Sequence, residues 1–163
     1  MKGKNMASVI RRAEEKDMEG INRLLLEVLL VHHAGRPDLF KGAGKKYTDE
    51  QLLAIIRDDL NPVFVSVDEN GYVEGHCFCQ TQMHPETAGT YEYKSLYIDD
   101  LCVEETLHGK KIGTRIYEYV KKYAKENGYY NVTLHAWECN PNAVAFYKAL
   151  GMGTQQYTME EIL

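Results

Sequence analysis

The sequence of 163 residues contains no apolar run near the length of about 20 residues that a membrane-spanning helix requires. Its start, MKGKNMASVIRRAEEKD, also lacks the apolar centre of a secretory signal peptide. Cysteine is scarce, and four residues in a chain of this size do not form a disulfide framework: Cys77, Cys79, Cys102 and Cys139. We therefore expect a protein of the reducing cytoplasm that has no membrane partner.

Blocks of like charge are absent as well. The chain has 19 basic and 24 acidic residues, which give a net charge of −5. Nucleic acid is therefore not an expected partner, whereas a cationic substrate would be favoured electrostatically. Cys77 and Cys79 share one strand face, but no second close pair completes a metal site, so we expect no metal and interpret both as buried thiols.

Periodicity and turn signals divide the chain into alternating elements. The length favours one domain over residues 1–163. Helices are predicted over residues 15–33, 49–59, 111–127 and 141–150, and strands over 8–13, 63–67, 72–83, 91–103, 131–135 and 152–158. An antiparallel meander followed by a strand–helix–strand crossover predicts an α/β fold of mixed α+β type, with helices on both faces of a central mixed sheet.

The segment "LHGKKIGT", residues 107–114, places two glycines and two lysines where the third long helix begins. A helix N-terminus exposes unpaired N–H groups and the positive end of the dipole, which Asp, Ser or Thr normally satisfies. A basic, glycine-bearing entry instead favours an external anion. The spacing fits neither a Walker loop nor a dinucleotide fingerprint, and a surface helix with solvated lysines is the alternative.

A second segment, "WECNPNAVAFYKALGM", covers residues 137–152. Asn140 and Pro141 open a short helix and Gly151 ends it, which is the usual placement of these residue types. We interpret Phe146 as a core residue. Its neighbour Tyr147 carries a hydroxyl group that packing alone does not require.

Together the two segments resemble the GCN5-related N-acetyltransferases, the acetyl-CoA-dependent GNAT superfamily. The loop of that family, Gln/Arg-x-x-Gly-x-Gly/Ala, aligns with His108, Lys111 and Gly113, so two of its three signature positions are substituted. The later pattern is matched throughout, by Asn140, Ala143, Val144, Phe146, Tyr147, Leu150, Gly151 and Met152. The order of elements also fits, so the resemblance covers nearly the whole chain and implies the GNAT fold.

The resemblance implies that acetyl-CoA is the cosubstrate and that backbone N–H groups hold its pyrophosphate. The corresponding residues are His108, Gly109, Lys110, Lys111, Ile112, Gly113 and Thr114. Backbone binding does not depend on side chains, so Lys111 can replace the family's glycine if it keeps a helical φ. Lys110 and Lys111 either add charge contacts or face solvent.

Further implied contacts lie at the end of the fourth strand, which splays from the fifth in this family. There the pantetheine arm and the thioester carbonyl would meet the backbone of Leu101, Cys102 and Val103, and an N–H aimed at the carbonyl would stabilise an oxyanion. Asn140 matches the position that hydrogen-bonds the pantetheine arm. From its sequence context alone Asn140 is a helix cap, and both roles can coexist.

Tyr147 matches the family's general acid for the CoA thiolate, and its phenol has a pKa close to that of a thiol. The segment "YIDDLCV" resembles the acidic segment of the diamine acetyltransferase branch. Because neighbours on a strand face opposite sides, we expect only one of Asp99 and Asp100 to reach the site, and we favour Asp99. Glu92 and His135 are the reserve candidates for the base.

The resemblance thus implies an N-acetyltransferase in which a primary amine attacks acetyl-CoA directly in a ternary complex. The acidic chain favours a small cationic acceptor of the polyamine or aminoglycoside type. Two alternatives stay open: a peptide or protein N-terminal acetyltransferase, and a degenerate acyl-CoA-binding module. Acceptor choice in this family lies in loops that correspond to residues 31–47 and 84–91, and relatives are often homodimers.

Overall fold

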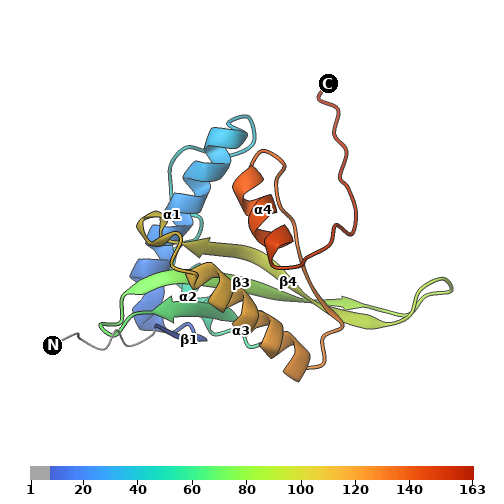
Figure 1. The fold of residues 1–163 in the computed structure, drawn as a ribbon, viewed down its shortest axis with the longest axis horizontal. Coiled ribbons are helices and arrows are strands. Elements are labelled where there is room, and N and C mark those ends of the chain that lie inside the picture. Colours follow the sequence, from blue (N-terminus) through green and yellow to red (C-terminus); the bar gives the residue numbers. More distant parts are fainter. Residues whose placement is uncertain (1–7) are drawn as a thin grey trace.

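The computed structural model describes residues 8–163, so the first seven residues of the expected domain lie outside it. Five strands form one mixed sheet in the order β1-β2-β3-β4-β5 (Figure 1). Strands β1 to β4 pair antiparallel in succession, whereas β5 runs parallel to β4. The strands are β1 (Val9–Arg12), β2 (Val63–Val67), β3 (Val73–His84), β4 (Tyr93–Val103) and β5 (Asn131–Leu134).

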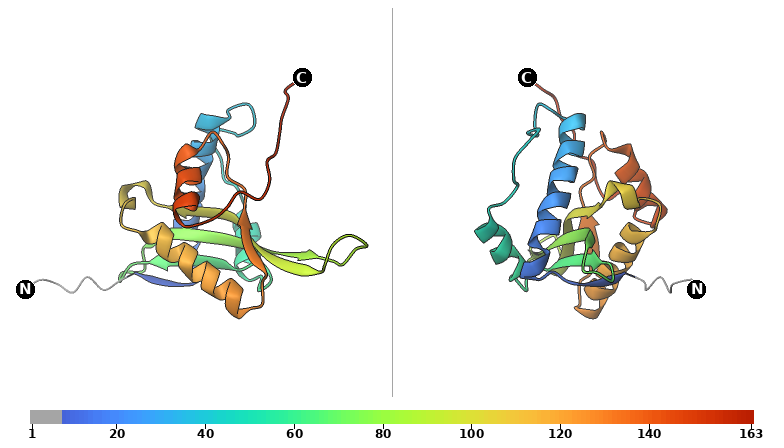
Figure 2. Two further views of the ribbon diagram at one scale, coloured as in Figure 1. Left: turned by 45° about the vertical axis from the view of Figure 1, so that its right-hand side comes forward. Right: turned by 90° about the vertical axis from the view of Figure 1, so that its left-hand side faces the viewer.

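Helices cover both faces of this sheet, which confirms the predicted fold class. They are α1 (Met18–Gly35), α2 (Asp49–Ile56), α3 (Ile112–Glu126) and α4 (Pro141–Ala149). Figure 2 shows α1 and α2 on one face and α3 on the other. No helix in residues 8–163 is long and apolar enough to cross a membrane.

Each face has its own apolar core. Ile21, Leu24 and Leu52 of α1 and α2 are fully buried against the sheet, together with Val65 of β2. On the opposite face α3 packs against the sheet. The buried residues of β2, β3 and β4 there are Phe64, Cys77, Cys79, Leu96 and Ile98, and those of α3 are Ile112, Ile116, Tyr117, Val120 and Ala124. The expected burial of Cys77 and Cys79 is confirmed, and burial raises the pKa of the Cys77 thiol.

Local capping explains where two of the helices begin. Thr48 accepts a hydrogen bond from the Gln51 N–H, and the Gln51 side chain accepts one from the Thr48 N–H, which forms a capping box at α2. A short 3₁₀ turn, η1 (Glu15–Asp17), precedes α1. The buried Asp17 carboxylate accepts hydrogen bonds from the Glu14 N–H at 2.8 Å and from Arg11 at 2.7 Å, which fixes the turn against β1.

The predicted sixth strand over residues 152–158 is wrong, because the chain after α4 has no regular structure. Met152 still packs against the α3 side of the core, but the residues that follow it are exposed, so strand pairing would bury little apolar surface. The tail is instead held by Arg36, whose guanidinium lies 2.7 Å from Glu160 and 2.7 Å from Asp38. The outer edge of β5 therefore has no paired strand among the described residues.

Candidate active site

The splay between β4 and β5 sets the position of the site. Parallel pairing joins residues 95–98 of β4 to residues 131–134 of β5, and β5 then ends while β4 continues to Val103. Residues 99–103 consequently have one edge paired with β3 and one edge without a strand partner. This open edge is where the resemblance expected the thioester.

Alternation along β4 shows which N–H groups face the open edge. The Glu104 N–H donates to the Glu74 carbonyl at 2.9 Å, toward β3. The N–H groups of Leu101 and Val103 therefore point the other way, to the open edge. By the same alternation the Cys102 N–H points toward β3, and its side chain is buried under α1 with the thiol 3.6 Å from the Leu24 carbonyl, so its backbone contact to the cosubstrate stays a prediction.

A β-bulge at Asp99 changes the faces of the two aspartates. Phe78 of β3 pairs with Asp100, but its neighbour Cys79 pairs with Ile98, so Asp99 is the extra residue. Strict alternation is broken here, and both carboxylates lie on the α1–α2 side of the sheet. The strict alternation on which the expectation of a single site aspartate rested is therefore wrong, and which of the two reaches the acceptor stays a prediction.

Asp99 opens onto a cavity of about 230 Å3 between α2 and β3. Tyr47 and Phe78 form a stacked aromatic wall of this cavity, with ring centroids 6.2 Å apart, and Asp58 is a second carboxylate in its lining. Lys46 lies 3.5 Å from Asp99. Burial works against the charged form of Lys46, but the charges of Tyr47, Asp100 and Asp99 raise its pKa above the ordinary value.

Asp100 is almost fully buried and pairs with His76 of β3, whose Nε2 lies 2.8 Å from the carboxylate oxygen Oδ2. Burial alone would raise the pKa of Asp100. The hydrogen bond and charge of His76, with smaller contributions from Lys46 and His32, lower that pKa below its ordinary value. The structure therefore places an ionised carboxylate directly beside the open edge.

The two reserve bases are placed differently. Glu92 precedes β4 at the far end of the projecting β3–β4 hairpin (Figure 1). Seven residues of extended chain separate it from Asp99, about 23 Å at 3.3 Å per residue, so it does not join the site. His135 follows β5 directly, and its Nδ1 lies 3.3 Å from the Tyr97 hydroxyl near the splay.

The start of α3 is open to an anion. Thr48 and Asn140 supply side-chain caps to α2 and α4, whereas within residues 8–163 no side chain caps α3. The first N–H groups of α3, those of Ile112, Gly113 and Thr114, have no carbonyl inside the helix to bond. This arrangement suits a phosphate group.

Lys111 does not keep the helical φ that the sequence analysis required. It adopts the left-handed conformation, with φ 60° and ψ 21°, at the N-cap of α3. Gly109, with φ 86°, reverses the chain just before it. Glycine, the family's residue here, adopts this left-handed conformation freely. Lys111 has a Cβ, so it adopts the conformation only with backbone strain.

Neighbouring contacts hold the loop in place. The His108 Nε2–H donates to the Val103 carbonyl at 2.9 Å, which ties the loop to the end of β4. Gly113 faces α4 closely, because a Cβ at this position would lie 3.2 Å from the Phe146 ring. A side chain here would require the Phe146 ring to shift, so packing between α3 and α4 favours glycine.

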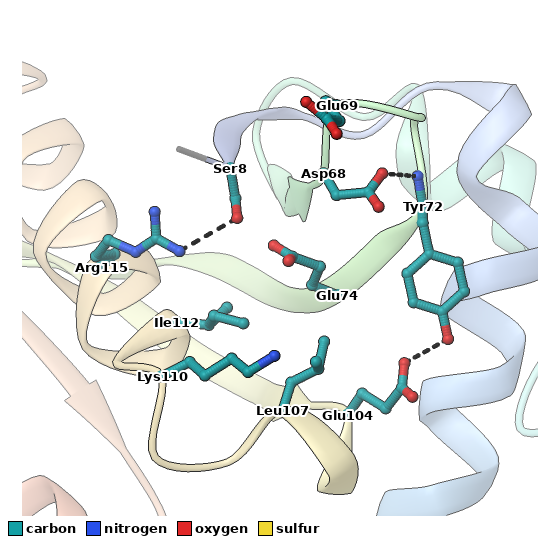
Figure 3. A pocket seen from close by; sticks show the side chains of 10 residues that line it. All are labelled: Ser8, Asp68, Glu69, Tyr72, Glu74, Glu104, Leu107, Lys110, Ile112 and Arg115. Carbon is teal, nitrogen blue, oxygen red and sulfur yellow. Dashed lines mark hydrogen bonds between the residues drawn. The ribbon is translucent and has the colours of Figure 1, made fainter. Parts of the chain in front are cut away.

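Lys110 points away from the open edge, into a cavity of about 620 Å3 beside the β2–β3 turn (Figure 3). Four carboxylates belong to the lining of this cavity: Asp68, Glu69, Glu74 and Glu104. The side chain of Lys110 could contact the pyrophosphate or face solvent, and its conformation in the structure does not favour the pyrophosphate contact.

Tyr147 on α4 lies near the open edge of β4, within electrostatic range of Asp100. Burial raises the pKa of its phenol well above the ordinary value, and the charges of Cys77, Asp100 and Cys102 add to the effect. The Asn140 side chain accepts a hydrogen bond from the Ala143 N–H at 3.3 Å, which confirms the helix-cap interpretation.

Sequence reasoning missed His76 and Lys46. His76 interrupts an apolar strand segment, "VEGHCFCQ", and such a histidine signals a buried partner. Lys46 lies in a loop whose path the sequence does not specify, and no pattern pointed to it.

Comparison with known proteins gives a consistent result. Residues 28–152 match the Acetyltransferase (GNAT) family. A curated relative, the thialysine N-epsilon-acetyltransferase of Sus scrofa, is 28% identical over 152 residues, covering 90% of this chain and 85% of the relative.

Solved structures agree with this match. A crystal structure of a mutant protein from Bacillus halodurans superposes with a TM-score of 0.91 at 32% identity, covering 95% of this chain and 99% of that one. An aminoglycoside N-acetyltransferase in complex with CoA shares the fold, with a TM-score of 0.72 at 13% identity over 100% of this chain and 99% of that one. The chain belongs to the GNAT family of acetyltransferases and is an N-acetyltransferase.

Proposed function

We propose that this N-acetyltransferase moves the acetyl group of acetyl-CoA to the primary amine of a small cationic acceptor, by direct attack in a ternary complex. The observation that carries the proposal is the open edge of β4 at residues 99–103. Two carboxylates, Asp99 and Asp100, lie beside it, and the Tyr147 phenol lies within electrostatic range of Asp100.

The residues fit the cosubstrate that the family uses. The uncapped N–H groups of Ile112, Gly113 and Thr114 suit its pyrophosphate. The N–H groups of Leu101 and Val103, which face the open edge, suit the amide groups and thioester oxygen of its pantetheine arm. When bound, this cosubstrate supplies the activated acetyl group.

The chain's own residues then have distinct tasks. Leu101 and Val103 offer N–H groups to the oxygen on which negative charge develops, an effect worth several kcal/mol in acyl transfer, roughly 3 for one donor. Tyr147 gives its proton to the departing thiolate. Its raised pKa keeps the phenol protonated at neutral pH, so the proton is present when it is needed.

The acceptor is bound through charge. Asp99 and Asp100 lie beside the open edge, and Asp58 lies further along the same cavity. Lys46 now occupies the position near Asp99 that an acceptor ammonium would take. Thialysine and aminoglycosides, which the names of two similar enzymes mention, are both cationic amines. Water at the exposed side of Asp99 carries away the proton that the ammonium loses before attack.

A degenerate binding module is the less favoured alternative, because the uncapped start of α3, the open edge and Tyr147 are all in place. A peptide acceptor would need a longer groove than the 230 Å3 cavity beside Asp99. We also propose a cytoplasmic location, since all four cysteines are free thiols.

An acceptor screen tests the proposal. Release of free CoA would be followed with thialysine, lysine, polyamines, aminoglycosides, neutral amino acids and peptides. We expect cationic small amines to react fastest and added salt to raise their KM through screening. Asp99→Asn should raise the acceptor KM or lower turnover and leave acetyl-CoA binding unchanged, whereas Asp68→Asn, in the remote acidic cavity, should change neither. A preference for neutral amino acids with a fully active Asp99→Asn variant would reject the cationic acceptor.

A further inference from the structure

His76 is a fully buried histidine in the middle of β3, where apolar side chains would be expected. Its Nε2 lies 2.8 Å from Asp100 Oδ2, and its Nδ1 is buried without a hydrogen-bond partner among the described residues. The ring meets Phe78 edge to face, with centroids 5.0 Å apart. Buried polar atoms rarely lack partners, so this pair requires an explanation.

Stability does not supply that explanation. A carboxylate and an imidazole both lose hydration when buried, and their attraction often fails to offset that loss. Two apolar side chains of similar volume would pack the same space between β3 and β4 at a lower cost. The pair is therefore better explained by a use for the charge of Asp100 than by its contribution to folding.

The geometry indicates that use. Asp100 directly follows the bulge and lies where the edge of β4 becomes open. The acceptor at Oδ2 is a carboxylate, so Nε2 carries the proton and donates it. His76 thus fixes one carboxylate oxygen, while Oδ1 has no hydrogen-bond partner among the described residues and the side chain keeps 8% of its surface exposed.

Other charged and titratable groups surround Asp100 from each neighbouring element. Besides His76, they are Cys77 from β3, Lys46 from the loop after α1, His32 from α1, Asp99 and Cys102 from β4, and Tyr147 from α4. Burial lowers the pKa of His32, against the opposing effect of Asp100. Lys46 is the exposed cation of the group, since its side chain keeps 41% of its surface accessible, and an acceptor ammonium can replace it near Asp99 without changing the charge balance.

We propose that His76 is a positioning residue that keeps Asp100 ionised and oriented, with Oδ1 free to bind the acceptor ammonium at the open edge of β4. His76 itself transfers no proton. This inference rests on the proposed function and deepens it, because it names a second carboxylate for the acceptor and the residue that controls that carboxylate.

The first part of the test measures whether His76 controls the ionisation of Asp100, independently of the acetyl-transfer rate. The pKa of Asp100 would be measured by carboxyl ¹³C NMR in the wild type, in His76→Phe, which lacks the donor, and in His76→Gln, whose amide can replace it. We expect the Asp100 pKa to rise by about one unit or more in His76→Phe, since desolvation is then unopposed, and to stay near wild type in His76→Gln. If His76→Phe does not fold, His76→Leu serves the same purpose.

Kinetics with thialysine at saturating acetyl-CoA form the second part. His76→Phe should about double the acceptor KM at a pH equal to the variant's measured Asp100 pKa, because half of the carboxylate is then protonated, with the loss vanishing about two pH units higher, and His76→Gln should restore it. The rise in melting temperature caused by acetyl-CoA should be the same in all variants. In an Asp100→Asn background, His76→Phe should cause no further loss.

An unchanged Asp100 pKa in the donor-free variant would overturn the inference, and so would a changed pKa with wild-type acceptor kinetics. Equal losses in the wild-type and Asp100→Asn backgrounds would also reject it, because His76 would then act independently of Asp100. A wild type that acetylates no amine, yet shows the pKa change, would refute the proposed function and leave the charge control of Asp100 by His76 established.

Discussion

Tyr147 is half-buried on α4, and desolvation raises the pKa of its phenol. Tyr147→Phe keeps the ring and its edge contact with Phe146, whose centroid lies 5.1 Å away. Turnover should fall by roughly 10²- to 10⁴-fold, the range typical of general acids, while acetyl-CoA affinity stays near wild type. Steady-state kinetics and calorimetric titration would measure the two quantities. Unchanged turnover would mean that the thiolate leaves without this proton donor.

Lys111 carries backbone strain at the N-cap of α3. A left-handed conformation costs a side-chain-bearing residue roughly 1–2 kcal/mol, and glycine's extra unfolded-state entropy offsets up to about 1 kcal/mol of the relief. Lys111→Gly should therefore raise the free energy of unfolding by about 0.5–1 kcal/mol. Lys110→Gly is the matched control and should lower it, because Lys110 has no positive φ. Urea denaturation distinguishes the two, and a destabilised Lys111→Gly would show that its side chain outweighs the strain.

At the scale of elements, we propose that the loop before α3 and the α3 N-terminus act together as the anion site. Acetyl-CoA should raise the melting temperature of the wild type, because a ligand of the native state stabilises it by mass action. Gly113→Pro deletes one of the three free N–H groups and should abolish the shift. Gly113→Ala keeps the N–H but places a Cβ 3.2 Å from the Phe146 ring, so it should only weaken the shift. A full shift in Gly113→Pro would reject this part of the site.

The order of the elements could be predicted because each has a local signature: the Asn70-Gly71 turn between the apolar segments of β2 and β3, and a 3.6-residue period in α1 and α3. The bulge at Asp99 could not, since it arises from how β4 pairs with β3 and not from any residue type in "YIDDLCV". The last strand was predicted from composition, whereas its formation depends on apolar burial that residues after Met152 do not provide.

The same distinction applies to the site. The position of Gly113 in the first turn of α3 and the cap at Asn140 follow from local sequence. The pairing of His76 with Asp100, 24 positions later in the chain, depends on strand register. The placement of Lys46 near Asp99 depends on a loop path. Such long-range contacts leave no local pattern.

For the whole molecule, acid stability should depend on the Arg11–Asp17 pair. Asp17 is 2% exposed and accepts two hydrogen bonds from Arg11, at 2.7 and 3.0 Å. Burial would raise the Asp17 pKa, but Arg11 and the Glu14 N–H lower it below the unfolded value. Its contribution is therefore complete above the unfolded pKa of about 4 and is lost as pH falls through the lower folded pKa.

Arg11→Met would leave Asp17 without its cation and should lower the free energy of unfolding by about 3 kcal/mol at pH 7. The difference from wild type should shrink near pH 3, where Asp17 becomes protonated in the variant. Denaturant titrations at both pH values would measure it. The double variant Arg11→Met/Asp17→Asn should recover much of the lost free energy of unfolding. An equal difference between Arg11→Met and wild type at both pH values would contradict the role of the Arg11–Asp17 pair.

The early end of β5 also sets a limit on how stable this fold can become. Five residues further along, β5 would pair with residues 99–103 of β4 and add hydrogen bonds that the sheet now lacks. Such a completed sheet would resist heat better and would have no place for a thioester. Selection or engineering for thermal tolerance is therefore opposed at this one edge, where the most stable arrangement of the backbone is an inactive one.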